Sequence, residues 1–331
     1  MQHLLIEKLE FVIINGLCAD YGSRFCPCIL AVTGGCAVCS QVNGKAFCDC
    51  KASGGICIKQ ELLRNGGKAK PSRLTYECEV MSVIHYDGLV FFRVKVPLSL
   101  EREVKRPGGF VFVRRKDAVS WYDVPISVQF EEMMVGSIGM TLLFRGVKTN
   151  QFKDLAEGDT LLLRGPFNNG LLGLQHLEAQ QSSRCLILTK GIGLLPSVSA
   201  VMYLQSRHNE TELYVDEGNF SPSILKFQLD LFELPYRPLT LLDDDSELST
   251  SAKHLIRRFV TDGGSLIHVG ASEYVIHQVA AYLQYIGSSH VKLSACNNAK
   301  MCCGEGVCGA CTEITADRRV IHHCKEQVKI K

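Results

Sequence analysis

The residues of this chain with the clearest chemical potential are cysteines near its two ends. Of the 16 cysteines in 331 residues, eight lie within residues 18–57 and six within residues 296–324. A disulfide-rich secreted protein would distribute its cysteines more evenly, whereas clustered thiols at C-x-C and C-x2-C spacings are typical of metal ligands in a reducing compartment. We therefore predict metal sites at both ends of the chain. The isolated Cys78 and Cys185 are expected to be core residues.

The C-terminal cysteines have the spacing of one particular kind of iron–sulfur site. C-x4-C-x2-C followed by a distant cysteine is the plant-type 2Fe–2S pattern. The glycines between the cysteines allow the backbone to curl around a cluster and to aim N–H groups at sulfur. A zinc site that uses His322 or His323 is the alternative, and Cys296 and Cys302 are expected to be neighbours rather than ligands. The predicted ligands are Cys303, Cys308, Cys311 and Cys324.

Four segments are expected to position these cysteines. Residues 1–70 form the first cysteine-rich segment and end in a polar run that suits a linker. Residues 74–170 contain β-branched and aromatic runs between turn signals, which predict an antiparallel β-barrel. Residues 182–288 alternate strand and helix patterns, which predict a doubly wound parallel sheet. Residues 289–331 contain the closing cysteine loop.

Within the alternating segment the individual elements can be predicted from their patterns. Strands are predicted at 212–216, 239–242 and 265–270. Apolar residues across 252–260 recur at helical spacing, and a second helix is predicted to begin after Ser272 as its N-cap.

The loop "MCCGEGVCGAC" resembles the cluster loop of the electron-transfer subunit of dihydroorotate dehydrogenase. That family has a ferredoxin-reductase-like body, in which an FAD-binding barrel precedes a nicotinamide domain and a C-terminal 2Fe–2S segment, and residues 74–331 show the same order. The small subunit of NADH-dependent ferredoxin–NADP oxidoreductase, also described as a sulfide dehydrogenase subunit, is similar in architecture. One of its ligands is an aspartate, and this chain has Cys303 at the equivalent place.

The resemblance implies that FAD binds to the barrel. The family motif R-P-x-S, in which arginine meets the flavin's phosphate and serine the isoalloxazine, corresponds here to "VPIS", with Val124 in place of arginine. The sequence "FRGVKT" corresponds to a strand end and turn that meet the pyrophosphate in the family. Lys148 or Arg145 would supply the phosphate charge that Val124 lacks. The residues assigned to FAD are Pro125, Ile126, Ser127, Phe144, Arg145, Lys148 and Thr149.

A nicotinamide site is implied by "LTKGIGLLPSV", which resembles the family's G-G-G-I-G-x-x-P turn. Such a strand–turn–helix brings backbone and a helix N-terminus close to a pyrophosphate, so NAD(P)(H) is assigned to Gly191 and Gly193. Lys190 replaces a glycine and either adds a cation for phosphate or obstructs its approach. The family's C-G-P segment, whose cysteine often faces the nicotinamide, is replaced by "GAS" at residues 270–272.

The N-terminal segment has enough cysteines for two four-coordinate sites. The C-x-C pairs are commoner in zinc–thiolate loops, whereas an electron carrier downstream favours additional iron–sulfur clusters, so the sequence leaves zinc and iron–sulfur open. A zinc-stapled docking module would suit a segment with so little core of its own. The candidate ligands are Cys18, Cys26, Cys28, Cys36, Cys39, Cys48, Cys50 and Cys57.

These features together predict an electron-transfer flavoprotein subunit. It would pass electrons between NAD(P)H, FAD and a 2Fe–2S cluster, to or from a partner oxidoreductase subunit. The partner would be a flavoprotein of the dihydroorotate dehydrogenase type or one like the glutamate synthase small subunit, and ferredoxin is a further candidate. No acid–base or nucleophile constellation is recognisable. The alternatives are a cluster-bearing subunit that has lost flavin and nicotinamide binding, and a zinc-dependent interaction protein.

Composition narrows the cellular setting. A formal net charge of +2 and 46% hydrophobic residues are typical of a soluble globular protein and indicate neither nucleic acid nor an anionic membrane as partner. No stretch approaches the roughly 20 apolar residues of a membrane span. Residues 1–18 mix charged with apolar side chains, which predicts an amphipathic helix rather than a signal peptide. We expect a cytoplasmic protein.

Overall fold

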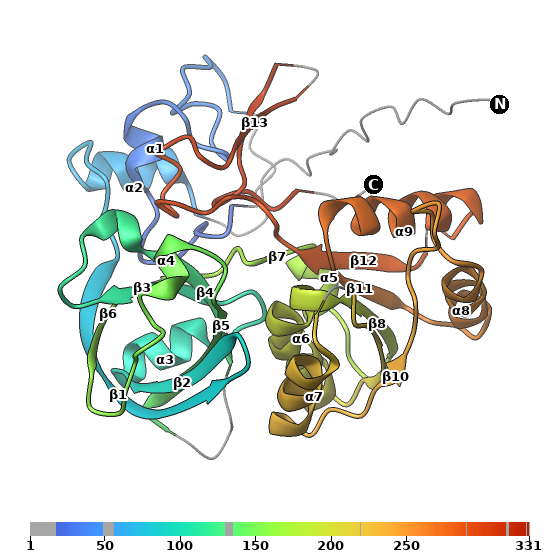
Figure 1. The fold of residues 1–331 in the computed structure, drawn as a ribbon. Coiled ribbons are helices and arrows are strands. Elements are labelled where there is room, and N and C mark those ends of the chain that lie inside the picture. The colour runs from blue at the N-terminus through green and yellow to red at the C-terminus, as the bar shows by residue number, and fades with distance from the viewer. Residues whose placement is uncertain are drawn as a thin grey trace.

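The computed structural model describes residues 18–48, 56–129, 135–218, 220–288, 290–315, 318–328 and 330. The helix predicted within residues 1–18 lies outside this range except for Cys18, and so does the candidate ligand Cys50. The described chain forms a barrel beside a layered sheet domain, with the two cysteine-rich segments next to each other along one side (Figure 1). None of the helices in these ranges has both the length and the apolar character needed to cross a membrane.

The barrel is closed and antiparallel, as predicted, with strand order β1-β2-β5-β4-β3-β6. Strand β2 is buried along nearly its whole length, because its apolar run packs into the barrel core with Phe92 at its centre. Short helices α3 (Leu98–Val104), η1 (Ser120–Tyr122) and α4 (Val147–Asn150) connect the strands. The strands are β1 (Leu74–Tyr86), β2 (Leu89–Lys95), β3 (Phe110–Arg115), β4 (Val124–Gln129), β5 (Ser137–Leu143) and β6 (Thr160–Phe167).

The second domain has a sheet of order β10-β9-β8-β11-β12-β7, and it is parallel except for the edge strand β7. The prediction of a doubly wound sheet is confirmed. Its strands are β7 (Leu171–Leu172), β8 (Arg184–Lys190), β9 (Glu210–Asp216), β10 (Arg237–Pro238), β11 (Leu266–Gly270) and β12 (Lys292–Cys296). Its helices are α5 (Leu174–Glu178), η2 (Gly191–Gly193), α6 (Leu194–Ser206), α7 (Pro222–Leu231), α8 (Thr250–Thr261) and α9 (Glu273–Tyr285).

Each face of this sheet has its own core. Leu186 and Leu188 of β8 face the core shared with α8 and α9, whereas Cys185 and Ile187 face the core shared with α6 and α7. The alternation follows from the two-residue period of a strand. Cys185 and, in the barrel, Cys78 are both buried, as predicted.

The strand predicted at 239–242 is wrong. On the outer edge of β9 the described ladder contains only β10, two residues earlier, and the Leu239 N–H adds one bond to the Val215 carbonyl at 3.0 Å. The Leu241 N–H donates instead to the Asp216 carboxylate at 2.7 Å, and Leu242 makes an isolated bridge with Leu248. Side-chain capture of a backbone N–H competes with strand pairing. The helix predicted after Ser272 is present as α9, with Ser272 at the N-cap but without a side-chain capping bond.

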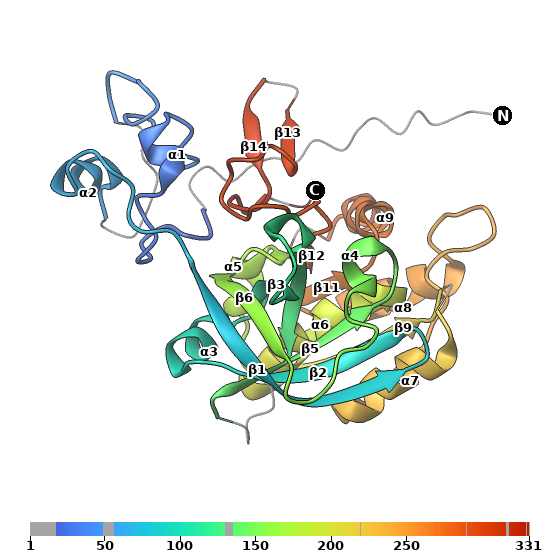
Figure 2. The ribbon, with the colours of Figure 1, turned by 60° about the vertical axis from the view of Figure 1, so that its left-hand side comes forward.

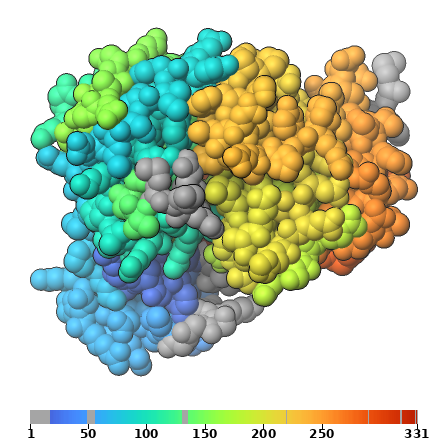
Figure 3. All heavy atoms as spheres, turned by 90° about the horizontal axis from the view of Figure 1, so that it is seen from below, coloured from blue at the N-terminus to red at the C-terminus, as the bar shows by residue number. Residues whose placement is uncertain are grey.

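The barrel and the sheet domain pack tightly against each other (Figure 3). Leu89 and Leu143 of the barrel are buried against Leu195 and Ile224 of α6 and α7. In the same interface Gln228 accepts a hydrogen bond at 3.1 Å from the Gln129 amide. The barrel therefore contacts the sheet domain through strands β2, β4 and β5, which face helices α6 and α7.

The two cysteine-rich segments are far apart in sequence but adjacent in space (Figure 2). The N-terminal segment contains α1 (Ile29–Val32) and α2 (Ile58–Arg64), and the C-terminal segment contains the hairpin of β13 (Thr312–Ile314) and β14 (Val320–His322). A backbone bridge joins Cys18 to Glu326.

Candidate metal centre and cofactor sites

The predicted C-terminal ligands come together because the β13–β14 hairpin reverses the chain. Cys303, Cys308 and Cys311 precede the hairpin, and Cys324 follows it. The N–H of His323 donates to the Cys311 carbonyl at 3.1 Å, which closes the loop beside the fourth cysteine.

The four thiols of this loop interact with one another. The Cys324 thiol is within hydrogen-bonding reach of Cys303 and Cys311, and Cys303 is within reach of Cys308. Backbone N–H groups also converge on the sulfurs: Gly306 donates to Cys324 Sγ at 3.2 Å. The Cys303 sulfur accepts N–H groups from Glu305, Val307 and Cys308.

These contacts change the acidity of the thiols. The hydrogen bond from Cys324 lowers the pKa of Cys303 to about 3 and that of Cys311 to about 6, while the pKa of Cys324 is raised. No group of three or more His, Cys, Asp or Glu side chains in the described ranges has the arrangement of a site for a metal ion. A 2Fe–2S cluster divides four thiolates between two irons and takes hydrogen bonds at its sulfurs. By donor chemistry and N–H supply, the loop fits that group.

Buried charges fix this loop to the rest of the chain. The guanidinium of Arg73, which precedes the barrel, pairs with Asp20 of the N-terminal segment and with Glu305 of the loop, the latter at 2.9 Å. Lys325 Nζ lies 2.5 Å from Asp20 and 2.7 Å from Glu305. The side chains of Arg73, Asp20 and Lys325 are all nearly inaccessible to solvent. Two cations and two carboxylates thus form one network that joins three parts of the chain.

The electrostatics of this network are self-consistent. Burial opposes the charge on Lys325, but Asp20 and Glu305 outweigh it, so its pKa lies above the ordinary value. Burial likewise opposes the charge on Asp20, but Lys325 and Arg73 hold its pKa below the usual value. The Arg73 guanidinium also lies 4.4 Å from the ring centroid of Phe167.

A second arginine links the barrel to the loop. Arg164 of β6 donates to the Cys303 carbonyl at 2.9 Å and to Asp123 at 3.2 Å. Its guanidinium lies over the Phe112 ring, 4.5 Å from the centroid. Arg164 therefore attaches the backbone of a predicted cluster ligand to β6, the last strand of the barrel.

The N-terminal cysteines divide into two groups. Cys39 is buried beside Ala31 and Ile58, and Cys48 and Cys57 are exposed. Four of the other described cysteines line one cavity between α1 and the start of α2, and these are Cys18, Cys26, Cys28 and Cys36.

The residues predicted for FAD lie on β4 and on the turn after β5. Pro125, Ile126 and Ser127 pair with β3, and Ser127 is half-buried. The Lys148 ammonium donates to the Asp123 carbonyl at 3.3 Å, which places the turn beside the start of β4.

In that turn Phe144 is half-buried, and Arg145 and Lys148 are exposed. The Thr149 hydroxyl accepts the Arg145 and Gly146 N–H groups at 2.8 and 3.1 Å. Two exposed cations and a serine hydroxyl therefore lie at this end of the barrel. This donor set suits a phosphate-bearing flavin although Val124 carries no charge.

The glycine turn after β8 is required by packing. A Cβ at Gly193 would lie 2.0 Å from the Gly270 carbonyl oxygen, and one at Gly191, where φ is +56°, would lie 2.8 Å from the Phe220 ring. The Arg145 guanidinium lies over that ring, 4.9 Å from its centroid. Phe220 therefore connects the predicted FAD turn with the predicted nicotinamide turn. Lys190 forms an ion pair with Asp216 at 2.5 Å.

A buried histidine is linked to this turn through a serine hydroxyl. His268 of β11 contacts the Ser197 hydroxyl at 3.0 Å and the Ser294 hydroxyl at 2.8 Å. Ser197 in turn donates to the Gly193 carbonyl at 2.7 Å. Burial lowers the pKa of His268 to about 4, so the ring is neutral near pH 7. Cys296, predicted to be a neighbour of the cluster ligands, packs against this network.

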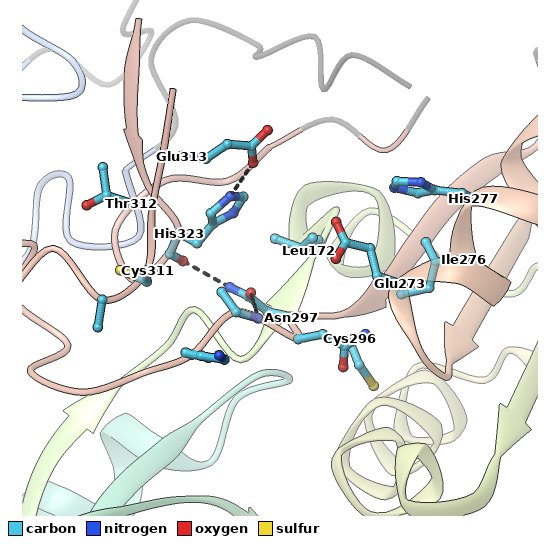
Figure 4. A pocket seen from close by; sticks show the side chains of 14 residues that line it. Leu172, Glu273, Ile276, His277, Cys296, Asn297, Cys311, Thr312, Glu313 and His323 are labelled. Atoms are coloured by element: carbon cyan, nitrogen blue, oxygen red, sulfur yellow. Dashed lines mark hydrogen bonds and ion pairs between the residues drawn. The ribbon is translucent and has the colours of Figure 1, made fainter. Parts of the chain in front are cut away.

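An open pocket of about 320 Å³ lies between α9, the end of β12 and the cysteine loop (Figure 4). Cys311, Glu313 and His323 form the loop side, and His323 pairs with Glu313 at 2.7 Å. Asn297 donates to the His323 carbonyl at 2.9 Å. The described lining includes none of the residues predicted for FAD or for the nicotinamide turn, so this pocket is a separate feature beside the cysteines.

The sequence did not reveal the residues that hold these sites together. Glu305 falls inside the cysteine motif and Lys325 directly follows its last cysteine, whereas Asp20 and Arg73 carry no signal in the sequence. An ion pair between residues 305 positions apart depends on the whole tertiary structure. His268 and Arg164 appeared only as single polar residues in apolar strands.

The barrel followed by the parallel sheet is the fold of ferredoxin–NADP reductase-like proteins. Among solved structures, the chain is similar to an NADH-dependent reduced ferredoxin–NADP oxidoreductase studied for flavin-based electron bifurcation (TM-score 0.55, 16% identity, 77% of this chain and 90% of that chain). It is also similar to a ferredoxin–NADP⁺ reductase from Neisseria gonorrhoeae with bound FAD and NADP (TM-score 0.50, 17% identity, 67% of this chain and 98% of that chain).

By sequence, the chain is also similar to two curated proteins, an electron transfer subunit and a sulfhydrogenase subunit. The chain is 24% identical over 209 residues to the electron transfer subunit of dihydroorotate dehydrogenase B (NAD⁺) from Streptococcus pneumoniae (strain ATCC BAA-255 / R6), covering 63% of this chain and 78% of the relative. It is 28% identical over 125 residues to sulfhydrogenase 1 subunit gamma from Pyrococcus furiosus, covering 38% and 40%. No family model matches the chain. The resemblance to the dihydroorotate dehydrogenase subunit that the sequence indicated is thereby confirmed.

Proposed function

We propose that this chain is an electron-transfer subunit that binds FAD and a 2Fe–2S cluster and connects NAD(P)H with a partner oxidoreductase subunit. The observation that carries the proposal is the cysteine loop. Its four thiols contact one another and receive several backbone N–H groups, on a body whose relatives are electron-transfer subunits and reductases.

The residues present define how each group would be held. Cys303, Cys308, Cys311 and Cys324 would bind the cluster, with Arg164 fixing the Cys303 backbone. Arg145 and Lys148 would neutralise flavin phosphates, with Ser127 facing the ring system, and the turn at Gly191 and Gly193 would accept the nicotinamide dinucleotide. Bound FAD would supply the exchange between two-electron nicotinamide chemistry and one-electron cluster chemistry.

The exposed side of the loop suits contact with a partner. Val307, Cys308, Gly309 and Ala310 are all exposed, and the Val307 side chain is 63% accessible. A cluster bound there would have one ligand at the molecular surface, which shortens the path to an acceptor. The partner would be an oxidoreductase subunit, as for the named relatives, and either a dihydroorotate dehydrogenase-like or a glutamate-synthase-small-subunit-like flavoprotein would suit.

Two observations favour a second candidate, a cluster-bearing subunit without flavin or nicotinamide chemistry. Val124 stands where the related family has its phosphate-binding arginine. Lys190 is tied to Asp216, which also accepts the Leu241 N–H. Flavin content decides between the two functions, because the second requires iron without FAD.

The test compares Cys308→Ser with Cys302→Ser after anaerobic purification of the full chain. Both cysteines are exposed and lie in the same loop, but only Cys308 belongs to the predicted ligand set. We expect the wild type and Cys302→Ser to reduce a one-electron acceptor with NADH or NADPH. Cys308→Ser should lose about two irons per chain and this activity while it keeps FAD. Equal iron and activity in both variants would refute the assignment.

A further inference from the structure

The N-terminal cysteines offer a site that the proposed function does not require. Four of them line a single cavity, although they are spread over residues 18–36. They reach it from different backbone segments, since Cys18 lies on the bridge to Glu326 and Cys28 is the N-cap of α1. Such convergence from one short segment is the arrangement expected of a polynuclear metal site rather than of scattered core thiols.

The cavity walls fit a metal–sulfur group. Apart from the cysteines and Asp20, whose carboxylate is paired with Arg73 and Lys325, they are largely apolar, including Leu30, Ala31, Val38 and Ile58. An apolar wall limits water access and sets the local dielectric around a metal centre.

Backbone N–H groups are aimed at these sulfurs as well. Cys36 Sγ accepts the Cys39 N–H at 3.4 Å and also the Val38 N–H. Cys26 accepts the Gly22 N–H, and Cys18 accepts that of Asp20. Hydrogen bonds of this kind accompany thiolates bound to metals and help to set the potential of iron–sulfur clusters.

The cavity adjoins the C-terminal loop. The Ala19 N–H donates to the Lys325 carbonyl at 2.8 Å, so a single hydrogen bond connects the residue after Cys18 with the residue after Cys324. Leu30, which lines the cavity, also packs on the loop, because a Cβ at Gly306 would lie 2.7 Å from its Cδ1 atom. A redox-active group in the cavity would therefore be the immediate neighbour of the loop.

The geometry points to a second metal centre, a four-iron cluster bound by Cys18, Cys26, Cys28 and Cys36. A zinc ion would draw its sulfurs to about 2.3 Å from one atom. In the described ranges no three His, Cys, Asp or Glu side chains meet around a single ion, and these four thiols instead line a common cavity. This inference rests on the proposed function only in placing the new cluster beside an electron-carrying loop. It extends the chain of one-electron centres from the body into the N-terminal segment.

The test measures iron, zinc, acid-labile sulfide and FAD per chain in the full-length protein purified anaerobically. Cys28→Ser and Cys36→Ser should each lose about four irons relative to the wild type and keep about two irons and the FAD, which shows that the body is folded. Cys48→Ser is the matched control, because Cys48 is exposed and does not line the cavity. It should keep the wild-type iron content.

Three results would overturn the inference. Unchanged iron in Cys28→Ser and Cys36→Ser would remove the site, and an equal loss in Cys48→Ser would show that the ligand set is wrong. Stoichiometric zinc that disappears in Cys28→Ser would replace the cluster by a structural ion. None of these results touches the proposed function, whose own failure would appear as missing FAD or as unchanged iron in Cys308→Ser.

Discussion

The two cysteine-rich segments are adjacent but are built in different ways. The C-terminal loop extends from the central sheet, and Arg164 of the barrel holds it at the Cys303 carbonyl. The N-terminal segment has a small core of its own, centred on Ala31, Cys39 and Ile58. The folded body holds the loop through Arg164 and the sheet, whereas the N-terminal segment has only this small core, so we expect a group bound in its cavity to add much of its stability.

Removal of metal should have the largest effect, and we expect it to destabilise the N-terminal segment far more than the folded body. Metal binding contributes on the order of 10 kcal/mol to the folding of small metal-dependent segments. After anaerobic chelation of iron, we expect backbone amides within residues 18–48 to exchange rapidly with deuterium, while those of β2 in the barrel remain protected. Hydrogen exchange followed by mass spectrometry gives both readings in one sample. Continued protection of residues 18–48 in iron-free protein would mean that the segment folds without its ligand.

Breaking the buried charge network should have the next largest effect. Arg73→Met leaves Asp20 and Glu305 with Lys325 as their remaining cation in the network. Removal of one partner from a buried ion pair costs about 3–5 kcal/mol, which corresponds to roughly 10²- to 4 × 10³-fold faster exchange where local opening governs it. The Ala19 amide, which bonds to Lys325, is the reporter. The expected result is detachment of the N-terminal segment from the loop.

Arg24→Ala is the control for that experiment. Arg24 also joins the N-terminal segment to the body, through an ion pair with Glu103 at 2.7 Å. Its side chain is 51% exposed, and exposed pairs contribute about 0–1 kcal/mol. Exchange at Ala19 should therefore change little. If Arg24→Ala and Arg73→Met had equal effects, burial would not be what makes the network strong.

The sequence predicted the individual structural elements better than the contacts that hold them together. Periodic apolar runs are a local signal, and they predicted the barrel, the parallel sheet and helix α8, whose Leu255, Ile256 and Phe259 are buried as their spacing required. The 303–324 ligand set came from spacing alone. The choice of four cysteines among eight in the N-terminal segment could not be made, because it depends on which thiols the fold turns inward.

The misplaced strand at 239–242 has a related cause. Its residues, Leu-Thr-Leu-Leu, have strand propensity, but Asp216 of the neighbouring strand captures the Leu241 N–H. A side chain 25 residues away thus decides where the ladder ends. The buried pairs of Arg73 and Lys325 are equally invisible in sequence, since each partner is an ordinary charged residue until the fold brings them together.

The smallest predicted effect concerns the contact between the two segments at Gly306. Gly306 and Gly309 have nearly the same backbone conformation, with φ of +78° and +76°. A Cβ at Gly306 would meet Leu30 Cδ1 at 2.7 Å, whereas the nearest atom to one at Gly309 is Thr312 Oγ1 at 3.9 Å. Gly309→Ala should therefore carry only the conformational penalty, about 1–2 kcal/mol. Gly306→Ala should cost about 1–3 kcal/mol more through overpacking.

The comparison of these two variants isolates the contact, since conformational strain is common to both. Free energies of unfolding from urea titration, with iron content recorded for each sample, give the difference. In Leu30→Ala/Gly306→Ala the clash is absent, so the double variant should lose less stability than the sum of its single variants. Simple additivity would show that Leu30 does not press on the loop in solution. The two cysteine-rich segments would then be linked by their charges and backbone bridge alone.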